Sequence, residues 1–276
     1  KDNTRIIAYA TQGGLGLPNR DYYLRDDAAS VAQLDKYRAH IAAMLVLGGA
    51  KAAAAKADAA AIVALETRLA EAFIPREEMR DPNRSYNIVG VEAADKATPH
   101  FPWTAFFDAL GLAGVREFSF SHPAYFAEMD EALASVPLPT WRAYLRWNVL
   151  RDWAPYLSKA FVDENFAFYA TNLRGQQQIK RREERAIEQM NRLLGEPLGQ
   201  LFVAKYFPPQ AKARMLRMIG DLKTALGARL QKLEWMGEDT RRQALEKWAS
   251  FTPKIGYPDK WRDYSALELA RDDYVG

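Results

Sequence analysis

Thr11-Gln-Gly-Gly-Leu-Gly-Leu-Pro-Asn-Arg-Asp-Tyr-Tyr-Leu24 contains the densest group of glycines in the chain, with three in four positions. Glycine tolerates positive φ, so the backbone can turn sharply here. Pro18 fixes φ just after the glycines, and Asn19 and Asp21 carry side chains that accept hydrogen bonds from nearby backbone N–H groups. A short β-type run at residues 5–10 precedes the stretch and a long helical pattern follows it. The sequence therefore predicts a tight turn between a strand and a helix.

A glycine turn in this position can also bind phosphate. The dinucleotide-binding pattern needs a third glycine at position 19, where this chain has Asn19, and a P-loop needs a Lys-Ser or Lys-Thr pair, which is missing here. We therefore favour a structural turn over a phosphate site.

Composition limits the class of protein. The chain has 276 residues, of which 49% are hydrophobic, enough for a substantial core. A net charge of +3 is too small by itself to indicate nucleic-acid binding. Cysteine is absent, which excludes disulfides and thiolate metal ligands. No apolar run reaches the ~20 residues of a membrane helix, and nothing at Lys1 resembles a signal peptide. Both ends look cut, so we expect a truncated chain, a cleavage product or one half of a split assembly.

Apolar spacing predicts a mainly α fold, a multi-helix domain with a few short β-strands. Thr140 is the expected N-cap of one helix, and Thr240 with Gln243 forms a capping-box pattern for another. Gly220 and Gly227 interrupt a long helix, where close packing would explain them. Strands are expected at 5–10 and 115–120, and helices at 28–47, 51–73, 103–110, from 138–140, 161–169, 209–233 and from 240.

Residues 101–126 are rich in aromatic side chains, and residues 180–185 are rich in charge. Aromatic rings can stack on bases, but no basic residues alternate with them, so core packing is the favoured interpretation. Lys180, Arg181 and Arg182 could contact nucleic acid. Glu183 and Glu184 nearly neutralise them, which favours a solvated helix face.

The sequence contains no recognisable catalytic centre. Its three histidines are His40, His100 and His122, and none has a neighbouring Glu or a second His four residues further on. The H-E-x-x-H pattern of zinc peptidases is therefore absent, as is G-x-S-x-G. We expect each histidine to be a packing or surface residue rather than a ligand. No catalytic and no metal-binding residue is assigned, and the substrate-binding residues are unknown.

Several motifs, taken in chain order, resemble the amino-terminal helical region of the neprilysin-like zinc metallopeptidases. The glycine stretch is the first, and Lys-Ile-Gly-Tyr-Pro-Asp at 254–259 is the most recognisable. Ile179 departs from the pattern, because many members carry Trp before the basic pair. The resemblance runs through nearly the whole chain, in the segments 13–24, 65–66, 69–70, 76–82, 86–87, 141–151, 154–158, 161–166, 173–175, 180–182, 194–207, 234–240, 251–259 and 261–264.

The resemblance implies a zinc-dependent metalloendopeptidase. Residues 1–276 would be its amino-terminal helical domain, with about 250–276 leading toward a catalytic domain that this chain lacks. In the family this region encloses a cavity and restricts substrate size. The complete enzyme would hold zinc, whereas none is expected on this chain, which alone should not hydrolyse peptides. The implied partners are the catalytic domain and peptide substrates, and the implied location is extracytoplasmic: periplasmic, secreted or anchored facing outward.

Two alternatives come from other functional classes. The chain could be a stand-alone helical binding module without catalysis, which would then present an exposed apolar face. It could also bind nucleic acid through residues 180–185, in which case binding would fall steeply with salt. The mixed charge of that segment makes the second alternative the weakest of the three.

Overall fold

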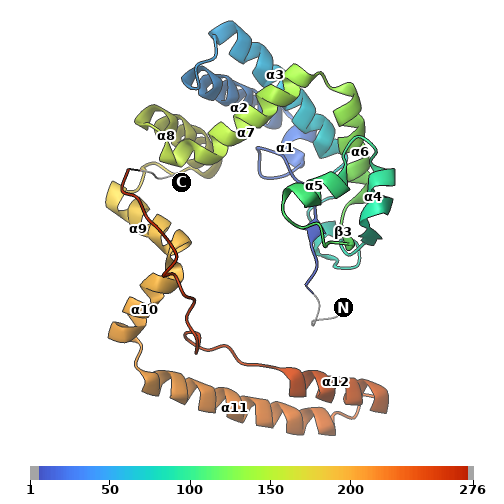
Figure 1. Cartoon of the computed structure of the whole chain (residues 1–276), viewed down its shortest axis with the longest axis vertical. Helices are drawn as coiled ribbons and strands as arrows, with labels where there is room; N and C mark the ends of the chain where they lie inside the picture. The colour runs from blue at the N-terminus through green and yellow to red at the C-terminus, as the bar shows by residue number, and fades with distance from the viewer. Residues whose placement is uncertain (1–5, 273–276) are drawn as a thin grey trace. The chain divides into compact units, whose positions relative to one another are not determined.

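The computed structural model describes residues 6–272 and is mainly α-helical (Figure 1). The chain divides into two compact units, Lys1–Ile179 and Lys180–Gly276, called unit 1 and unit 2 below. The predicted fold class, many helices with a few short strands, is confirmed. Residue 5 of the predicted first strand and the last four residues of the chain lie outside the described residues.

Unit 1 contains most of the helices. The pair formed by α2 and α3 packs against α7. The helix expected at 28–47 is found with these bounds as α2. The helical elements of unit 1 are α1 Asp21–Leu24, α2 Ala28–Leu47, α3 Ala52–Glu71, η1 Glu78–Arg80, α4 Val91–Ala97, α5 Trp103–Ala109, α6 Pro123–Ser135, α7 Leu138–Trp153, η2 Ala154–Tyr156, α8 Lys159–Asn165 and the π-helix η3 Phe166–Asn172.

The core of unit 1 follows from the apolar spacing of its helices. On α2, Tyr37, Ile41, Met44 and Leu45 are buried, as their 3.6-residue period predicts. Val31, at the start of the same stripe, remains exposed. Burial of such a stripe against neighbouring helices is the main source of helix stability in a protein.

A three-stranded sheet lies beside these helices. Its strands are β1 Tyr9–Ala10, β2 Ile88–Gly90 and β3 Glu117–Phe120, in the order β1-β3-β2. The central strand β3 pairs in parallel with β1 and antiparallel with β2. Phe118 and Phe120 of β3 pack on Trp103 of α5, and all three are buried. The aromatic segment therefore supplies core, as its composition indicated, rather than a stacking platform for bases.

Two predicted N-caps are wrong, although α7 does begin within the predicted stretch 138–140. Helix α7 begins at Leu138, after Pro137, so Thr140 lies inside it and makes no cap bond. Helix α12 (Glu238–Ser250) begins after Gly237, so Thr240 is also internal. In α7 a proline in the first turn replaces the expected cap: it has no N–H to satisfy, and its fixed φ suits a helix. In α12 two acidic residues in the first turn stabilise the exposed N–H groups.

Unit 2 consists of α9 Arg182–Leu193, α10 Gly195–Tyr206, α11 Pro209–Lys232, α12 and an irregular segment at 251–272 (Figure 1). Trp248 of α12 donates from Nε1 to the carbonyl oxygen of Lys223 on α11, at 2.7 Å. In the irregular segment, Tyr257 stacks on Trp261 with ring planes 5° apart, and Lys212 lies over the Tyr257 ring.

Unit 2 has almost no buried core of its own. Among its described residues only Gly227 and Met236 are buried. The stripe predicted for α11 is present, but Met218, Leu222 and Leu226 are about half-exposed. Large apolar side chains are exposed along the whole unit: Ile187, Met190, Leu193, Leu201, Phe202, Tyr206, Met215, Leu216, Met218, Leu222, Leu226, Trp235 and Phe251.

The two glycines of α11 differ in their surroundings. A Cβ on Gly227 would lie 2.8 Å from a Trp248 ring carbon, whereas a Cβ on Gly220 would meet no atom within 4 Å. Close packing therefore explains Gly227, as expected, but the same explanation is wrong for Gly220.

This difference gives a matched pair of variants. Gly220→Ala should stabilise α11 by about 0.5–1 kcal/mol, because alanine restricts the unfolded backbone more than glycine does. Gly227→Ala should instead separate α11 from α12 at a cost of about 1–3 kcal/mol through overpacking. Amide hydrogen exchange of α11 and α12 measures both effects. Equal behaviour of the two variants would contradict the packing of Trp248 on Gly227.

Candidate functional site: the glycine turn and its surroundings

The glycine turn lies inside unit 1, and side chains from three distant helices hold its carbonyl oxygens. Four successive carbonyls, at residues 13–16, each accept one side-chain hydrogen bond. A buried carbonyl without a partner is costly, and a turn has few backbone partners to offer. The donors are Tyr125 of α6 to Gly13 at 2.9 Å, Tyr144 of α7 to Gly14 at 2.7 Å, Arg151 of α7 to Leu15 at 3.4 Å and Tyr169 of η3 to Gly16 at 3.0 Å.

The N–H side of the turn is held by the fully buried carboxylate of Glu66 on α3. The backbone N–H of Gly16 donates to this carboxylate, and that of Leu17 donates to the Tyr23 hydroxyl at 2.9 Å. The hydroxyl of Tyr23 in turn donates to Glu66 Oε2 at 2.7 Å, and that of Tyr37 donates to the same oxygen at 2.9 Å. We call Glu66, these two tyrosines and the four carbonyl donors the turn network.

The hydroxyl groups of Tyr23 and Tyr37 both donate to Glu66. Tyr23 already accepts from Leu17, and Tyr37 already accepts from Trp147 Nε1 at 3.2 Å. Each hydroxyl has a single proton, so both protons point to Glu66. The site thus suits a group that only accepts hydrogen bonds, as an ionised carboxylate does.

Opposing effects act on the titration of this cluster. Burial raises the pKa of Glu66 above its ordinary value, and the hydrogen bonds from Tyr23, Tyr37 and Gly16 offset this only in part. Burial, and then the neighbouring Glu66 carboxylate, raises the pKa of both Tyr23 and Tyr37. The two hydroxyls therefore stay protonated and keep donating throughout the physiological range.

Close approach explains why glycine occupies these positions. A Cβ on Gly16 would lie 1.8 Å from the Tyr37 hydroxyl oxygen, and one on Gly14, which has a φ of +91°, would lie 2.4 Å from that of Tyr144. The N–H groups of Gly16 and Leu17 already donate to protein groups. A phosphate-binding loop needs such N–H groups free to face its ligand, so the geometry supports the structural turn.

The start of the turn is fixed to two other segments. The backbone N–H of Gln12 donates to Nδ1 of His122 at 3.0 Å, and the Gln12 side chain exchanges two hydrogen bonds with the backbone of Ile74. Burial lowers the pKa of His122. This agrees with the accepting role of Nδ1, which a protonated ring could not play.

The three histidines occupy separate places in unit 1. His40 is buried with its ring stacked on Phe168, and its Nδ1 lies 2.8 Å from Glu164. Burial lowers the pKa of His40, and Glu164 opposes the shift. His100 is half-exposed and its Nδ1 lies 2.8 Å from the buried Asp130. Residues 6–272 contain no group of three or more His, Asp or Glu side chains placed to hold a metal. They do not fit a catalytic zinc ion.

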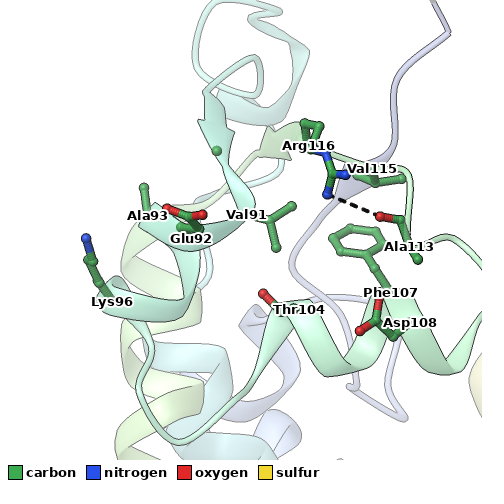
Figure 2. A pocket seen from close by; sticks show the side chains of 11 residues that line it. Val91, Glu92, Ala93, Lys96, Thr104, Phe107, Asp108, Ala113, Val115 and Arg116 are labelled. Atoms are coloured by element: carbon green, nitrogen blue, oxygen red, sulfur yellow. Dashed lines mark hydrogen bonds between the residues drawn. The ribbon is translucent and has the colours of Figure 1, made fainter.

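A separate pocket of about 580 Å³ lies between β2, α4 and α5, and Figure 2 shows its lining. Val91, Phe107 and Val115 form its apolar part, while Asp108 and Arg116 bring charges of both signs. Arg116 donates to the carbonyl oxygen of Ala113 at 3.3 Å. None of the turn-network residues lines this pocket, and its lining includes no histidine.

Two of the three basic residues that suggested nucleic acid have acidic partners. Lys180 pairs with Glu188, and Arg181 pairs with Glu184 at 3.0 Å. All four side chains have about half or more of their surface exposed, as is typical of a solvated helix face. The charge of this segment is therefore largely balanced locally.

The model of peptidase family M13 matches residues 1–258. The chain belongs to peptidase family M13. This confirms the predicted resemblance to the neprilysin-like peptidases and to their amino-terminal region.

Relatives within family M13 agree with this assignment. Human endothelin-converting enzyme-like 1 is 30% identical over 264 residues, which cover 94% of this chain and 34% of that protein. The crystal structure of zinc metalloprotease Zmp1 of Mycobacterium tuberculosis with an inhibitor superimposes with a TM-score of 0.85 and 36% identity, over 95% of this chain and 40% of that one. The chain thus spans 34% and 40% of these relatives. Within the described residues, no helix is both long and apolar enough to cross a membrane.

Sequence reasoning passed over the centre of the turn network. Leu65-Glu66 belongs to the motifs of the family resemblance, which do not reveal the role of the carboxylate. The signal was available, because Glu66 lies within the apolar stripe of α3, between Ile62, Leu65 and Leu69, all buried. An acidic residue in such a stripe predicts a buried, hydrogen-bonded carboxylate.

Replacing Glu66 tests the donor arrangement. Glu66→Gln should lower the free energy of unfolding by about 1–3 kcal/mol, because the amide NH₂ would face a hydroxyl that must donate. Glu71→Gln, on the exposed end of the same helix, is the matched control and should change little. Urea unfolding measures both. A Glu66→Gln variant as stable as the original chain would show that the hydroxyl protons do not depend on the carboxylate.

The close approach at Gly16 has its own test. Gly16→Ala should destabilise the chain by about 1–3 kcal/mol, since the added methyl displaces the Tyr37 hydroxyl. Gly13→Ala is the control, because a Cβ there meets no atom within 4 Å, and it should stay within about 0.5 kcal/mol of the original chain. Thermal unfolding of the two variants separates steric conflict from a general intolerance of side chains in the turn.

Proposed function

We propose that this chain is the non-catalytic helical region of a zinc-dependent metalloendopeptidase that hydrolyses peptides. Membership of family M13 and the similarity to a zinc metalloprotease support the reaction class. The chain spans only 34–40% of the relatives described above, and its described residues do not fit zinc. The remaining part of the enzyme would hold the metal, which would supply Lewis-acid activation of water there.

The exposed apolar surface of unit 2 is the observation that carries this proposal. Soluble monomers rarely expose contiguous apolar patches larger than a few hundred Å². Unit 2 exposes large apolar side chains on α9, α10 and α11 and buries almost none. A covering partner is therefore needed, and the rest of the same peptidase is the one that the length of the relatives implies.

Unit 1 would then form part of the wall around the substrate cavity and restrict the size of entering peptides. A wall needs a rigid scaffold, and the turn network joins α3, α6, α7 and η3 through one loop. The Mycobacterium tuberculosis protease has been solved in an open and in a partial open state. We propose a comparable opening here as the route by which peptides enter.

The remaining expectations follow from the same proposal. Residues 1–276 act as the amino-terminal helical region, and about 250–276 lead toward the catalytic part. The chain alone does not hydrolyse peptides, because it carries no H-E-x-x-H sequence. An extracytoplasmic location, with the active site facing outward, is proposed from the endothelin-converting enzyme relatives.

A stand-alone binding module remains the second candidate, and the same exposed apolar face of unit 2 favours it. Such a module would bind a different protein through this face and would have no catalytic partner. The two candidates differ in what covers unit 2 and in whether peptide hydrolysis follows.

Separate expression of the two parts of the full-length protein tests the proposal. This chain alone should show no hydrolysis of a fluorogenic peptide. Mixed with the remaining part and zinc, it should bind that part, gain hydrogen-exchange protection in α9–α11 and restore hydrolysis. The remaining part alone should accept longer substrates than the complex does, because the size restriction is gone.

Two controls make the result specific. Leu222→Glu on the exposed face of α11 should weaken assembly, because it places a charge where apolar contact is required. Asp221→Glu, on the neighbouring position, should leave it unchanged. Hydrolysis by the chain alone, or assembly without any gain of protection in unit 2, would rule out the proposed division of roles.

A further inference from the structure

A short exposed segment joins the two compact units. Residues 175–181, Gly-Gln-Gln-Gln-Ile-Lys-Arg, have no helix or strand, and α9 begins only at Arg182. Every residue from 174 to 184 is exposed. Such segments are where proteins are preferentially cut by proteases.

Little holds this segment in place. Its first residues close the end of η3, with the N–H groups of Gly175 and Gln176 donating to Thr171 and Ala170. Beyond these, the hydrogen bonds that the structure shows for residues 177–181 reach at most eight residues along the chain. The ion pairs of Lys180 and Arg181 are solvent-exposed, so water and salt screen the attraction between their charges. The segment can therefore straighten into a protease cleft at low cost.

The basic residues of the segment indicate which class of protease would cut it. Lys180, Arg181 and Arg182 are consecutive basic residues. A trypsin-class serine protease binds one Lys or Arg side chain in a pocket that contains a carboxylate. The residues before Lys180, three glutamines and Ile179, include no proline that would obstruct an extended conformation.

We propose that the peptide bond after Lys180 or Arg181 is a processing site for a trypsin-class endoprotease. The protease serine attacks the carbonyl carbon, the C–N bond breaks, and the leaving nitrogen takes a proton. Water then hydrolyses the acyl-enzyme, so that one water is consumed and a new carboxylate and a new amino group appear. The cut removes the covalent connection between the two units.

The contacts within each unit survive this cut. The turn network lies entirely within residues 13–169, and the contacts of Trp248 and Tyr257 lie entirely within unit 2. The nicked protein should therefore keep the fold of unit 1. Processing at this position would give a two-fragment form of the enzyme rather than an unfolded product.

The test is limited proteolysis of the full-length protein with trypsin, with a chelator present so that its own proposed peptidase activity is silent. The first new ends, identified by mass spectrometry, should lie after Lys180 or Arg181. The variant Lys180→Gln, Arg181→Gln, Arg182→Gln should be cut there at least about tenfold more slowly, because the pocket carboxylate loses its partner. Arg214→Gln, Arg217→Gln, Arg229→Gln, on exposed positions of α11, is the matched control and should be cut at the original rate.

A second measurement needs no variant. An endoprotease specific for Lys should cut the unmodified protein after Lys180 before any other lysine. First cuts elsewhere, an unchanged rate in the Lys180 variant, or a full-length protein that resists cutting at this position would each overturn the proposal. None of these outcomes depends on peptide hydrolysis by the M13 enzyme, so they are distinct from failure of its proposed function.

Discussion

A single buried carboxylate, that of Glu66, is the constraint on which unit 1 depends. It is fully buried and accepts hydrogen bonds from the hydroxyls of Tyr23 and Tyr37. An ionised carboxylate in such a place is costly unless every acceptor position is used. Here the helix α3, the glycine turn and the tyrosines of α1 and α2 must all be in place before that condition is met. The carboxylate thus couples segments that are distant in sequence.

The tyrosines extend this coupling outward. Four successive carbonyls of one loop are each held by a different side chain, from α6, α7 and η3. Tyrosine suits this role because its ring fills the core while its hydroxyl reaches a polar partner. The loop therefore acts as the shared centre of several helices, and the glycines are required because hydroxyl oxygens occupy the space of a side chain. The glycine motif resembles a ligand-binding loop, but in this protein it holds several helices together.

The two units differ in how they are stabilised. Unit 1 has a continuous core of aromatic and aliphatic side chains, whereas unit 2 leaves most of its apolar residues exposed. Hydrophobic burial is the main favourable contribution to folding, so unit 2 gains little of it from its own residues. This asymmetry is what a region that packs against a larger protein would show, and it agrees with a chain that spans well under half of its M13 relatives.

The sequence by itself determined the family and the helical class. Helix α2 was found with its predicted bounds, because its apolar residues recur every three to four positions and the helix faces one core. Local signals failed at Thr140 and Thr240, where the first turns are set by proline and by acidic residues instead of by a hydroxyl cap. The apolar stripe of α11 correctly predicted a helix, but it did not predict that the stripe is exposed. Periodicity shows which side of a helix is apolar, and it does not show whether another part of the protein covers that side.

Only the tertiary structure decided the role of Glu66 and of the glycine turn. Apart from the bond between Leu17 and Tyr23, which are six positions apart, their contacts join residues separated by 29 to 153 positions, and no local pattern encodes which hydroxyl meets which carbonyl. The same holds for the three histidines: the sequence showed that they lack the spacing of zinc ligands, and folding decided that His40 and His122 are buried while His100 is half-exposed. The physical reason is that residue types and their spacing fix local conformation, whereas burial and hydrogen-bond partners depend on segments brought together only when the chain folds.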